Sequence, residues 1–597
     1  MFIRTVKVPS SSGTVNEYVR VVESYRDDGK VKQRVVADLG RKDLLQELLP
    51  NLIRVLRGDP VVAGQEADVD ILQAWTWGPV LVVRALFEQL GLSPIVDQVL
   101  GQPRKRDDAA RVPYADRLFV LIANRLIRPA SEHGLARWLD NDFVCDRHGR
   151  RFVPHWHRRG RVQVDFRQLQ SWYRTLDRLV AAKNHLEVAL YGRLRDLFSL
   201  KPELVLYDIT STYFEGAGPK EFARHGYSRD GKPQNVQVVV GLVMVAGWPI
   251  AHHVWEGNTV DSTTVQEVVV DLMARFEFRR VVFVGDRGMV SEENLTALQK
   301  DGHGYLLGVR RRQNAELDGY LQRIDESRWQ DCPVGITSRE KKNNPPRTRV
   351  QEVTEKLAPQ DEKESTQQRI FIIDSDERRA YEESKRTQSQ ERTRVALEKL
   401  QKRVAQGRLR SPEQIGAAAG RILQKHHGHR YFAWELRDGV FHFFDHPVNL
   451  DREKRLEGKY VVMTSERDWD AVDAVQHYKE LAEVERSFRH LKDVLAMRPI
   501  YHQVQPRVAG HIFVAFLALL VERLLAKRLQ TARLDLSPTQ ALQAVESVRV
   551  VEFRLNREKR RGVSRGSPRA LQVLKALGID NTKPPTLRRG RPRSCSD

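Results

Sequence analysis

The chain has 597 residues, a formal net charge of +21 at pH 7 and a pI near 9.8. This length exceeds what one hydrophobic core supports, so several domains are expected, and the excess of Lys and Arg favours a polyanionic partner such as nucleic acid. Three scattered cysteines (Cys145, Cys332 and Cys595) exclude a disulfide framework, and the longest apolar run, 512–521, is too short to cross a membrane. We therefore expect a cytoplasmic protein without a membrane partner.

The first two hundred residues predict a small β element followed by helices. Alternating apolar residues at 18–25 and 31–37 flank an Asp-Gly turn, which is typical of a hairpin inside a domain at 1–60. Helical periodicity over 71–90, 114–127 and 165–198 predicts a helical, DNA-binding domain at 61–200.

A basic loop at 147–161 interrupts these helices. It either lies along a DNA backbone or is an ordinary solvated loop. Zinc binding by Cys145, His148, His155 and His157 is disfavoured, because their spacing lacks the paired ligands of zinc modules.

From residue 201 the pattern becomes that of an α/β sheet. Strands are expected at 204–209, 236–245, 249–255, 280–284 and 305–310, with a helix at 263–276. Two of these apolar strands carry a carboxylate, Asp208 in the first and Asp286 just after the fourth. A carboxylate in such surroundings requires a cation or a hydrogen-bond partner.

The α/β pattern stops at residue 310 and returns at 458. The residues between, 311–457, predict an inserted α+β domain with a long polar helix at 377–406, a capped helix from Ser411 and a hairpin at 431–444. The second part of the core, 458–530, begins with a strand and continues with a helix at 472–495 and a core helix at 508–525.

The helix at 472–495 carries a third carboxylate, Glu485, together with Tyr478, Arg489 and Lys492 on nearly one face. By itself this stripe also fits an ordinary Glu–Arg pair on a solvated helix. With Asp208 and Asp286, however, Glu485 completes a set of three carboxylates, which suits a hard cation such as Mg²⁺ in phosphoryl chemistry.

The last region, 531–597, is strongly basic and is expected to end in a disordered tail. The tail contains Arg589 and Arg591 in an Arg-Gly-Arg-Pro sequence. This sequence resembles the AT-hook, which inserts arginines into a narrow DNA minor groove; a plain basic tail is the alternative.

Three blocks of motifs carry a resemblance to a known family. They are Tyr207-Asp208-Ile-Thr-Ser-Thr-Tyr-Phe214 with Gly226-Tyr-Ser-Arg-Asp230; Trp255-Glu-Gly-Asn-Thr259 with Gly285-Asp286-Arg-Gly-Met-Val-Ser291; and Tyr478, Glu485 and Lys492. With these blocks the chain resembles the DDE transposases of bacterial insertion sequences, in the group related to insertion sequence four and its long, 1634-type members. It departs from that group at Leu481, where the C-terminal signature has an arginine, and Arg489 or Arg486 is a candidate substitute.

The resemblance implies an RNase H-like catalytic fold and makes Asp208, Asp286 and Glu485 the ligands of two Mg²⁺ or Mn²⁺ ions. It implies cleavage and joining of double-stranded DNA at element ends and target, by a protein that is at least a homodimer in the DNA complex. Tyr478, Arg489 and Lys492 would contact DNA near the cleaved end. The alternatives are a metal-dependent nuclease of the same fold without strand transfer, and a non-catalytic DNA-binding protein.

Overall fold

The computed structural model describes residues 1–9, 15–27, 30–43, 45, 69–103, 112–152, 155–158, 161–164, 166–200, 204–286, 291–309, 315–332, 346–353, 368–555 and 558–585. The chain forms two compact units. The first comprises 1–81, 141–151 and 542–597, and the second comprises 82–140 and 152–541.

The first unit contains two three-stranded sheets. One has the order β1-β2-β3 and is antiparallel, with bounds β1 (Phe2–Pro9), β2 (Val15–Asp27) and β3 (Lys30–Arg41). β2 and β3 confirm the two strands predicted from alternation, and β1 adds a strand that was not predicted. The predicted turn between them, 28–29, lies outside the described residues.

The other sheet joins the two ends of the sequence. β4 (Val69–Thr76) pairs antiparallel with β18 (Arg549–Leu555), which pairs with β19 (Glu558–Val563). The helix predicted over 71–90 is therefore wrong in its first part, and only α2 (Gly78–Gln89) is helical. The strand forms because its partner comes from the far end of the chain, which local periodicity does not reveal.

The C-terminal region is largely folded. It forms α16 (Pro538–Ala544), η6 (Val545–Ser547), β18, β19 and α17 (Pro568–Ala576). The predicted tail residues Arg589 and Arg591 lie outside the described residues.

Helices make up the first part of the second unit. They are α3 (Leu92–Leu100), α4 (Tyr114–Ile127), α5 (Leu135–Asn141), α6 (Phe166–Ala181) and α7 (Lys183–Phe198). A hairpin of β5 (His155–Arg158) and β6 (Arg161–Val164) occupies part of the predicted basic loop. The helical character predicted here is confirmed for 114–127 and 166–198.

The second unit is organised around a nine-stranded mixed sheet in the order β12-β13-β14-β17-β11-β10-β7-β8-β9. The strands that match the predicted α/β core are β7 (Leu204–Tyr213), β8 (Gln237–Val245), β9 (Trp248–Glu256), β10 (Val282–Asp286), β11 (Gly304–Val309) and β17 (Lys459–Thr464). β7, β10 and β11 are parallel to one another, whereas β8, β9 and β17 each run antiparallel to their neighbours. The predicted α/β class is confirmed.

The predicted insertion, 311–457, divides into two parts. Its first strands are β12 (Gln330–Asp331), β13 (Thr348–Val353) and β14 (Arg369–Ser375), and they extend the large sheet beyond β17. The sheet therefore does not stop at residue 310, as the sequence pattern suggested. Because these strands are short and lie far apart in the sequence, their alternation is a weak signal.

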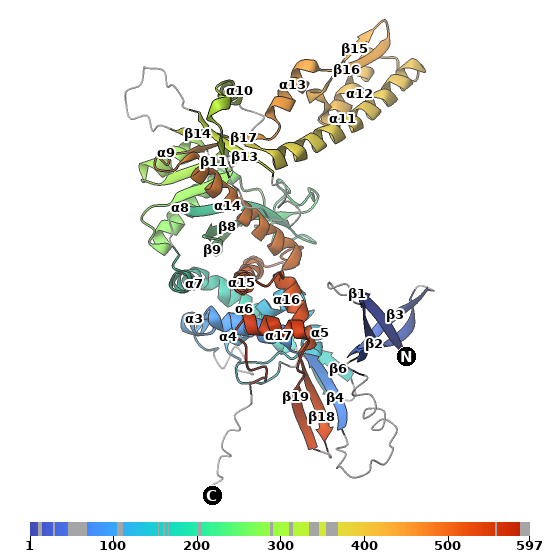
Figure 1. Ribbon diagram of the computed structural model, residues 1–597, viewed down its shortest axis with the longest axis vertical. Helices are drawn as coiled ribbons and strands as arrows, with labels where there is room; N and C mark the ends of the chain where they lie inside the picture. The colour runs from blue at the N-terminus through green and yellow to red at the C-terminus, as the bar shows by residue number, and fades with distance from the viewer. Residues whose placement is uncertain are drawn as a thin grey trace. The chain divides into compact units, whose positions relative to one another are not determined.

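The second part, residues 376–456, is called the arm below. It contains α11 (Asp376–Ala405), α12 (Pro412–Lys425), β15 (Phe432–Arg437), β16 (Val440–Asp445) and α13 (Pro447–Leu456), which group together in Figure 1. The predicted long helix, Ser411 cap and hairpin are confirmed: the Ser411 side chain accepts a hydrogen bond from the Gln414 N–H. The arm has its own apolar core, which includes Leu397, Ile415 and Phe441.

Two helices lie on opposite faces of the large sheet. α8 (Asp261–Phe276) covers the face to which Tyr207 points, since the Tyr207 hydroxyl donates to Thr264 Oγ1 at 2.8 Å. α14 (Ala471–Arg489) contacts β7, β10 and β11 from the other side and continues as a π-helical turn, His490–Val494. α8 thus covers one face of the sheet, and the predicted site lies on the opposite face, beside α14.

A buried carboxylate fastens the helices to the edge strand β9. Glu187 on α7 is fully buried and accepts hydrogen bonds from Nδ1 of His252 at 2.8 Å and from Arg275 at 2.6 Å. Burial alone would raise the pKa of Glu187, but Lys183, His252 and Arg275 hold it far below its usual range. A buried acid with these partners is a structural ion pair that joins α7, α8 and β9.

α15 (Gln505–Thr531) is the central helix of the second unit. It and the bent pair α2–α3 are long and apolar enough to cross a membrane by composition, but α15 is almost entirely buried against α4, α6 and β9. It is therefore the core helix that the sequence predicted for 508–525. Its contact with α6 is close, because a Cβ on Gly510 would lie 2.8 Å from the Leu176 Cβ.

We expect Gly510→Ala to destabilise the protein by about 1–3 kcal/mol, because the added methyl forces apart two closely packed helices. The matched control is Gly192→Ala on α7, where no atom lies within 4 Å of the new Cβ. This change should be neutral or stabilising by up to about 1 kcal/mol, because alanine favours helix. Midpoints of urea unfolding check both, and equal effects of the two variants would contradict the close packing.

Candidate active site

The first two predicted carboxylates lie side by side on one face of the sheet. β7 and β10 are adjacent and parallel, with Leu206 level with Val284. Two residues further along each strand, Asp208 is level with Asp286, and both point away from α8 because side chains alternate in direction. Neighbouring strands are about 4.8 Å apart, so this register brings the two carboxylates close together.

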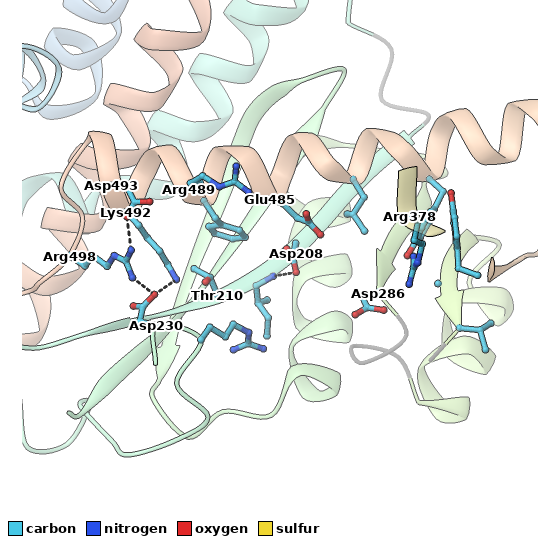
Figure 2. A pocket seen from close by; sticks show the side chains of 18 of the residues that line it. Asp208, Thr210, Asp230, Asp286, Arg378, Glu485, Arg489, Lys492, Asp493 and Arg498 are labelled. Carbon is cyan, nitrogen blue, oxygen red and sulfur yellow. Dashed lines mark hydrogen bonds and ion pairs between the residues drawn. The ribbon is translucent and has the colours of Figure 1, made fainter. Parts of the chain in front are cut away.

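The third carboxylate approaches from α14. Its apolar side chains Leu481, Val484 and Phe488 are buried, and this packing lays the helix across the sheet. Glu485 is exposed and faces the same space as Asp208 and Asp286 (Figure 2). Glu483, two residues earlier, instead pairs with Arg523 of α15 at 3.0 Å, so the two acids have different surroundings.

Asp208, Asp286 and Glu485 line one pocket of about 680 Å³. The pocket lies between the α14 face of the sheet and the helix, and the three contact residues predicted on α14 and its π turn, Tyr478, Arg489 and Lys492, also line it. Leu481, the position that departs from the family signature, is buried on α14 and lines the same pocket. Asp208 and Lys492, 284 positions apart in the sequence, thus share one cavity.

The electrostatics of Asp208 reflect this crowding of negative charge. Burial, and after it the nearby charges of Glu485 and Asp286, raise the pKa of Asp208 from 3.8 to about 7. The N–H of Ile209, which donates to the Asp208 carboxylate at 2.8 Å, and Arg229 oppose the rise. Such a shift is typical of carboxylates that share a site without a counter-ion.

A fourth carboxylate, Asp230, lies in the same pocket and was not predicted as a site residue. Its Oδ1 accepts hydrogen bonds from Lys492 Nζ at 2.7 Å and from Arg498 at 2.5 Å (Figure 2). The Asp230 side chain is 2% exposed, and its Oδ2 is buried without a hydrogen-bond partner. Burial lowers the pKa of Lys492, and Asp230 opposes that shift, so the acid keeps Lys492 charged.

Three arginines that the sequence did not indicate complete the pocket. Arg229 pairs with Asp261 at 2.6 Å, Arg498 also pairs with Asp493, and Arg378 comes from the first turn of α11. Arg378 stacks over the Tyr460 ring at 4.8 Å, and Tyr460 contacts the Tyr478 ring. No motif marks Arg378, because it belongs to the inserted segment and reaches the pocket only through the fold.

Of the two candidate substitutes for the missing signature arginine, only Arg489 lines the pocket. Arg486 forms an ion pair with Glu483 on the helix surface. Tyr478 lies over Gly308 of β11, where a Cβ would meet its hydroxyl at 2.1 Å, and burial raises the pKa of this hydroxyl. Glycine at 308 is therefore what allows the tyrosine to lie flat on the sheet.

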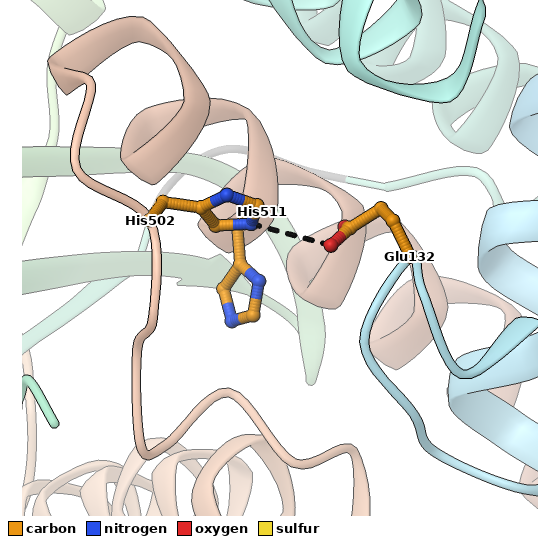
Figure 3. A group of neighbouring side chains, drawn as sticks. All are labelled: Glu132, His502 and His511. Atoms are coloured by element: carbon orange, nitrogen blue, oxygen red, sulfur yellow. Dashed lines mark ion pairs between the residues drawn. The ribbon is translucent and has the colours of Figure 1, made fainter. Parts of the chain in front are cut away.

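A second cluster has the composition of a metal site but the hydrogen bonds of a structural one. Glu132, His502 and His511 lie together (Figure 3). Nδ1 of His511 accepts from Arg125 at 2.8 Å, and its Nε2 donates to the Met497 carbonyl at 3.0 Å. Because both ring nitrogens are used and a guanidinium is adjacent, this cluster does not suit a cation.

The zinc interpretation of the basic loop gains no support from the described residues. Cys145 is buried, and the metal-like cluster found among the described side chains is the one around Glu132. The side chains of His155 and His157 lie outside the described residues.

Comparison with protein families decides the relationship. A family model for the transposase DDE domain matches residues 201–521, which is more than half of the chain. A model for the N-terminal domain of IS1634 family transposases matches residues 3–64. The chain belongs to the DDE transposases of the IS1634 type. A comparison with curated proteins gives no match.

Membership of the DDE transposases implies an RNase H-like fold, and the mixed sheet fits it. The strands β9-β8-β7-β10-β11 form an antiparallel trio followed by two strands parallel to β7. The matched region ends within α15 and includes every pocket residue named above. The transposase is therefore a DNA-cleaving enzyme of this family.

The raised pKa of Asp208 predicts how stability of the metal-free transposase depends on pH. The unfolded carboxyl has a pKa near 3.8 and the folded one about 7, so stability is lost as pH rises between these values. The loss is at most about 4 kcal/mol, at about 1.4 kcal/mol for each unit of pKa.

Asp208→Asn removes this loss, so its melting temperature should exceed that of wild type at pH 8 and approach it near pH 4. Mg²⁺ should raise the melting temperature of wild type at pH 8 more than that of the variant. Thermal melts with and without the ion measure both differences. A wild-type melting temperature that does not change between pH 4 and 8 would contradict the shift.

The Asp230 ion pair makes a second prediction. Asp230→Asn leaves the buried Lys492 beside the partly exposed Arg498 without their acid, and breaking a buried pair such as Asp230–Lys492 costs about 3–5 kcal/mol. Lys492→Met leaves Asp230 paired with Arg498 and should cost less. The double variant should be less destabilised than the sum of the two by at least about 1 kcal/mol, which unfolding of all four proteins measures. Strict additivity would show that the two residues are not coupled.

Proposed function

We propose that this transposase binds the ends of its insertion element and catalyses metal-dependent cleavage and strand transfer, with Asp208, Asp286 and Glu485 as metal ligands. The observation that carries the proposal is the convergence of these three carboxylates, from two strands and a helix, on one pocket. Cations line the same pocket on α11, α14 and the Arg498 segment. This combination of acids and bases fits metal-bound phosphate.

The donor set fits a hard divalent cation. Three carboxylates offer only oxygen ligands, as Mg²⁺ and Mn²⁺ prefer, and the raised pKa of Asp208 marks a site whose charge is not balanced by the protein. Two such ions, when bound, supply the activation of water or a 3′-hydroxyl and the stabilisation of the leaving oxygen. The raised pKa also means that protons compete with the ions for Asp208, so binding should weaken below about pH 7.

The remaining pocket residues orient the DNA. Lys492 and Arg498, held by Asp230, present their charge beside the carboxylates, where they contact a phosphate next to the cleaved bond. Arg489 takes the place of the missing signature arginine from an exposed position one turn beyond Glu485. The Tyr478 ring, fixed over Gly308, forms a wall against which the cleaved end is positioned.

The partners follow from the reaction. The substrates are double-stranded element ends and target, and synapsis of two ends requires at least a dimer in the DNA complex. The positively charged tail with Arg589 and Arg591 is proposed to add contacts in the minor groove. The proposed compartment is the cytoplasm, where the buried thiols of Cys145 and Cys332 stay reduced.

We expect Asp208→Asn, Asp286→Asn and Glu485→Gln each to reduce cleavage of element ends by more than about 100-fold. Loss of a residue that only supports a metal ligand lowers activity by up to about 100-fold, and loss of a ligand itself should cost more. End binding should remain within a few-fold of wild type, because none of these acids attracts phosphate. The assay uses labelled ends and a supercoiled target with Mg²⁺, and follows cut and joined products separately.

Glu483→Gln is the matched control, because Glu483 lies on the same helix but faces α15. It should cleave and join at nearly the wild-type rate. Normal cleavage by any of the three carboxylate variants would refute the site. Cuts by wild type without joined product would favour the nuclease.

A further inference from the structure

The arm carries a basic groove that is separate from the catalytic pocket. The groove has a volume of about 460 Å³ and lies between α11, the end of α12, the turn η4 (Gly428–Arg430) and α13. Its basic lining residues are Lys385, Arg386, Arg392, Lys425 and Arg430, and its acidic ones are Glu382, Glu453 and Glu457. Two of the acids are already engaged, since Glu457 pairs with Arg386 at 2.6 Å and Glu382 accepts from Arg378 and the Gly458 N–H.

The cations that remain face solvent. Lys385, Arg392 and Lys425 are exposed, and within the described part of the chain none of them forms an ion pair. Ser389 and Gln388 add neutral polar groups to the same lining, and His426 and His427 lie at its edge. Exposed, unpaired cations around a concave polar surface are what a phosphate backbone binds.

One helix, α11, contributes residues to both the groove and the catalytic pocket. Arg378, which lines that pocket, precedes Lys385 by 7 residues and Arg392 by 14 in α11. Steps of 7 and 14 return to nearly the same helix face, so Arg378, Lys385 and Arg392 form one stripe. At 1.5 Å per residue the stripe extends about 21 Å, which corresponds to about 6 base pairs of duplex.

The base of this helix is fixed to the catalytic sheet. Asp374 at the end of β14 is 3% exposed and pairs with Arg379 of α11 and with Arg349 of β13. Arg386 reaches Glu457, just before β17. These contacts hold the first three turns of α11 against β14 and β17, so the groove keeps a defined direction from the pocket.

We propose that the stripe and groove of the arm, formed by Lys385, Arg392 and Lys425, bind the phosphate backbone of duplex DNA that continues about 6 base pairs or more beyond the scissile phosphate. The inference rests on the proposed function, because it takes the catalytic pocket as the place where DNA is cut. The proposed DNA contact on the arm is additional to the catalytic pocket, and cleavage at the three carboxylates does not depend on it.

The test measures binding of fluorescein-labelled duplexes that contain an element end, over salt concentrations between about 50 and 200 mM. The groove variant combines Lys385→Gln, Arg392→Gln and Lys425→Gln. The slope of log affinity against log salt falls by about 0.9 for each lost phosphate contact, so it should decrease by up to about 2.7. The decrease should appear with duplexes that extend at least about 6 base pairs past the cut and vanish with shorter ones.

Duplexes extended on the element side and on the flanking side are measured separately, and a length-dependent change on either side supports the proposal. The matched control neutralises three exposed cations elsewhere on the arm, Lys402, Arg408 and Arg437, and should leave the slope unchanged. A charge-conserving variant, Lys385→Arg with Arg392→Lys and Lys425→Arg, should retain the wild-type slope, which separates loss of charge from loss of folding.

Equal slopes for wild type and the groove variant on long duplexes of both kinds would overturn the groove. Cleavage and joining by wild type in the same experiment would then leave the proposed function intact. Wild-type protein that binds the duplexes but cuts none would refute the proposed function alone. Wild-type protein that binds no duplex would overturn both.

Discussion

The structure of the second unit depends on bringing three negative charges to one face of a sheet. Asp208 and Asp286 are neighbours because β7 and β10 run parallel in a register that sets these two residues level, and Glu485 meets them because α14 lies across both strands. This repulsion costs folding free energy, and the raised pKa of Asp208 reflects that cost. Stability for the rest of the unit comes from elsewhere: the apolar helix α15, the buried Glu187 network and the closed α8 face.

The protein offsets its acids without neutralising them. Lys492 and Arg498 line the same pocket as the three predicted ligands but pair with a separate acid, Asp230, which holds their charge beside those ligands. A direct pair between Lys492 and Asp208 would have filled the coordination positions with a permanent cation. Asp230 therefore separates the phosphate-binding charges from the metal-binding ones. This division explains why a buried ion pair lies within the pocket.

Much of this fold was predictable from the sequence, for reasons that particular residues illustrate. The strands with Asp208 and Asp286 and the helix with Glu485 have strong local patterns, and an acid within an apolar strand is a local anomaly that can be read directly. β4 was mistaken for helix because its partner strand, 549–555, comes from the other end of the chain. β13 and β14 were missed as members of the sheet because only the pairing of β14 with β17, and of β13 with β14, places them there.

The same distinction applies to the site. Residues that the motifs mark line the pocket, whereas Arg378 and Arg498 reach it only through the tertiary structure. Arg378 lies there because β14 leads directly into α11 beside β17. Arg498 lies there because the π-helical turn and the segment after it return toward Asp230. From the sequence alone, residues 311–457 look like an insertion that separates the second acid from the third. In three dimensions its strands widen the catalytic sheet, and its long helix begins at the pocket wall. The inserted segment is thus built onto the catalytic unit, and its position follows from the sheet that holds the acids.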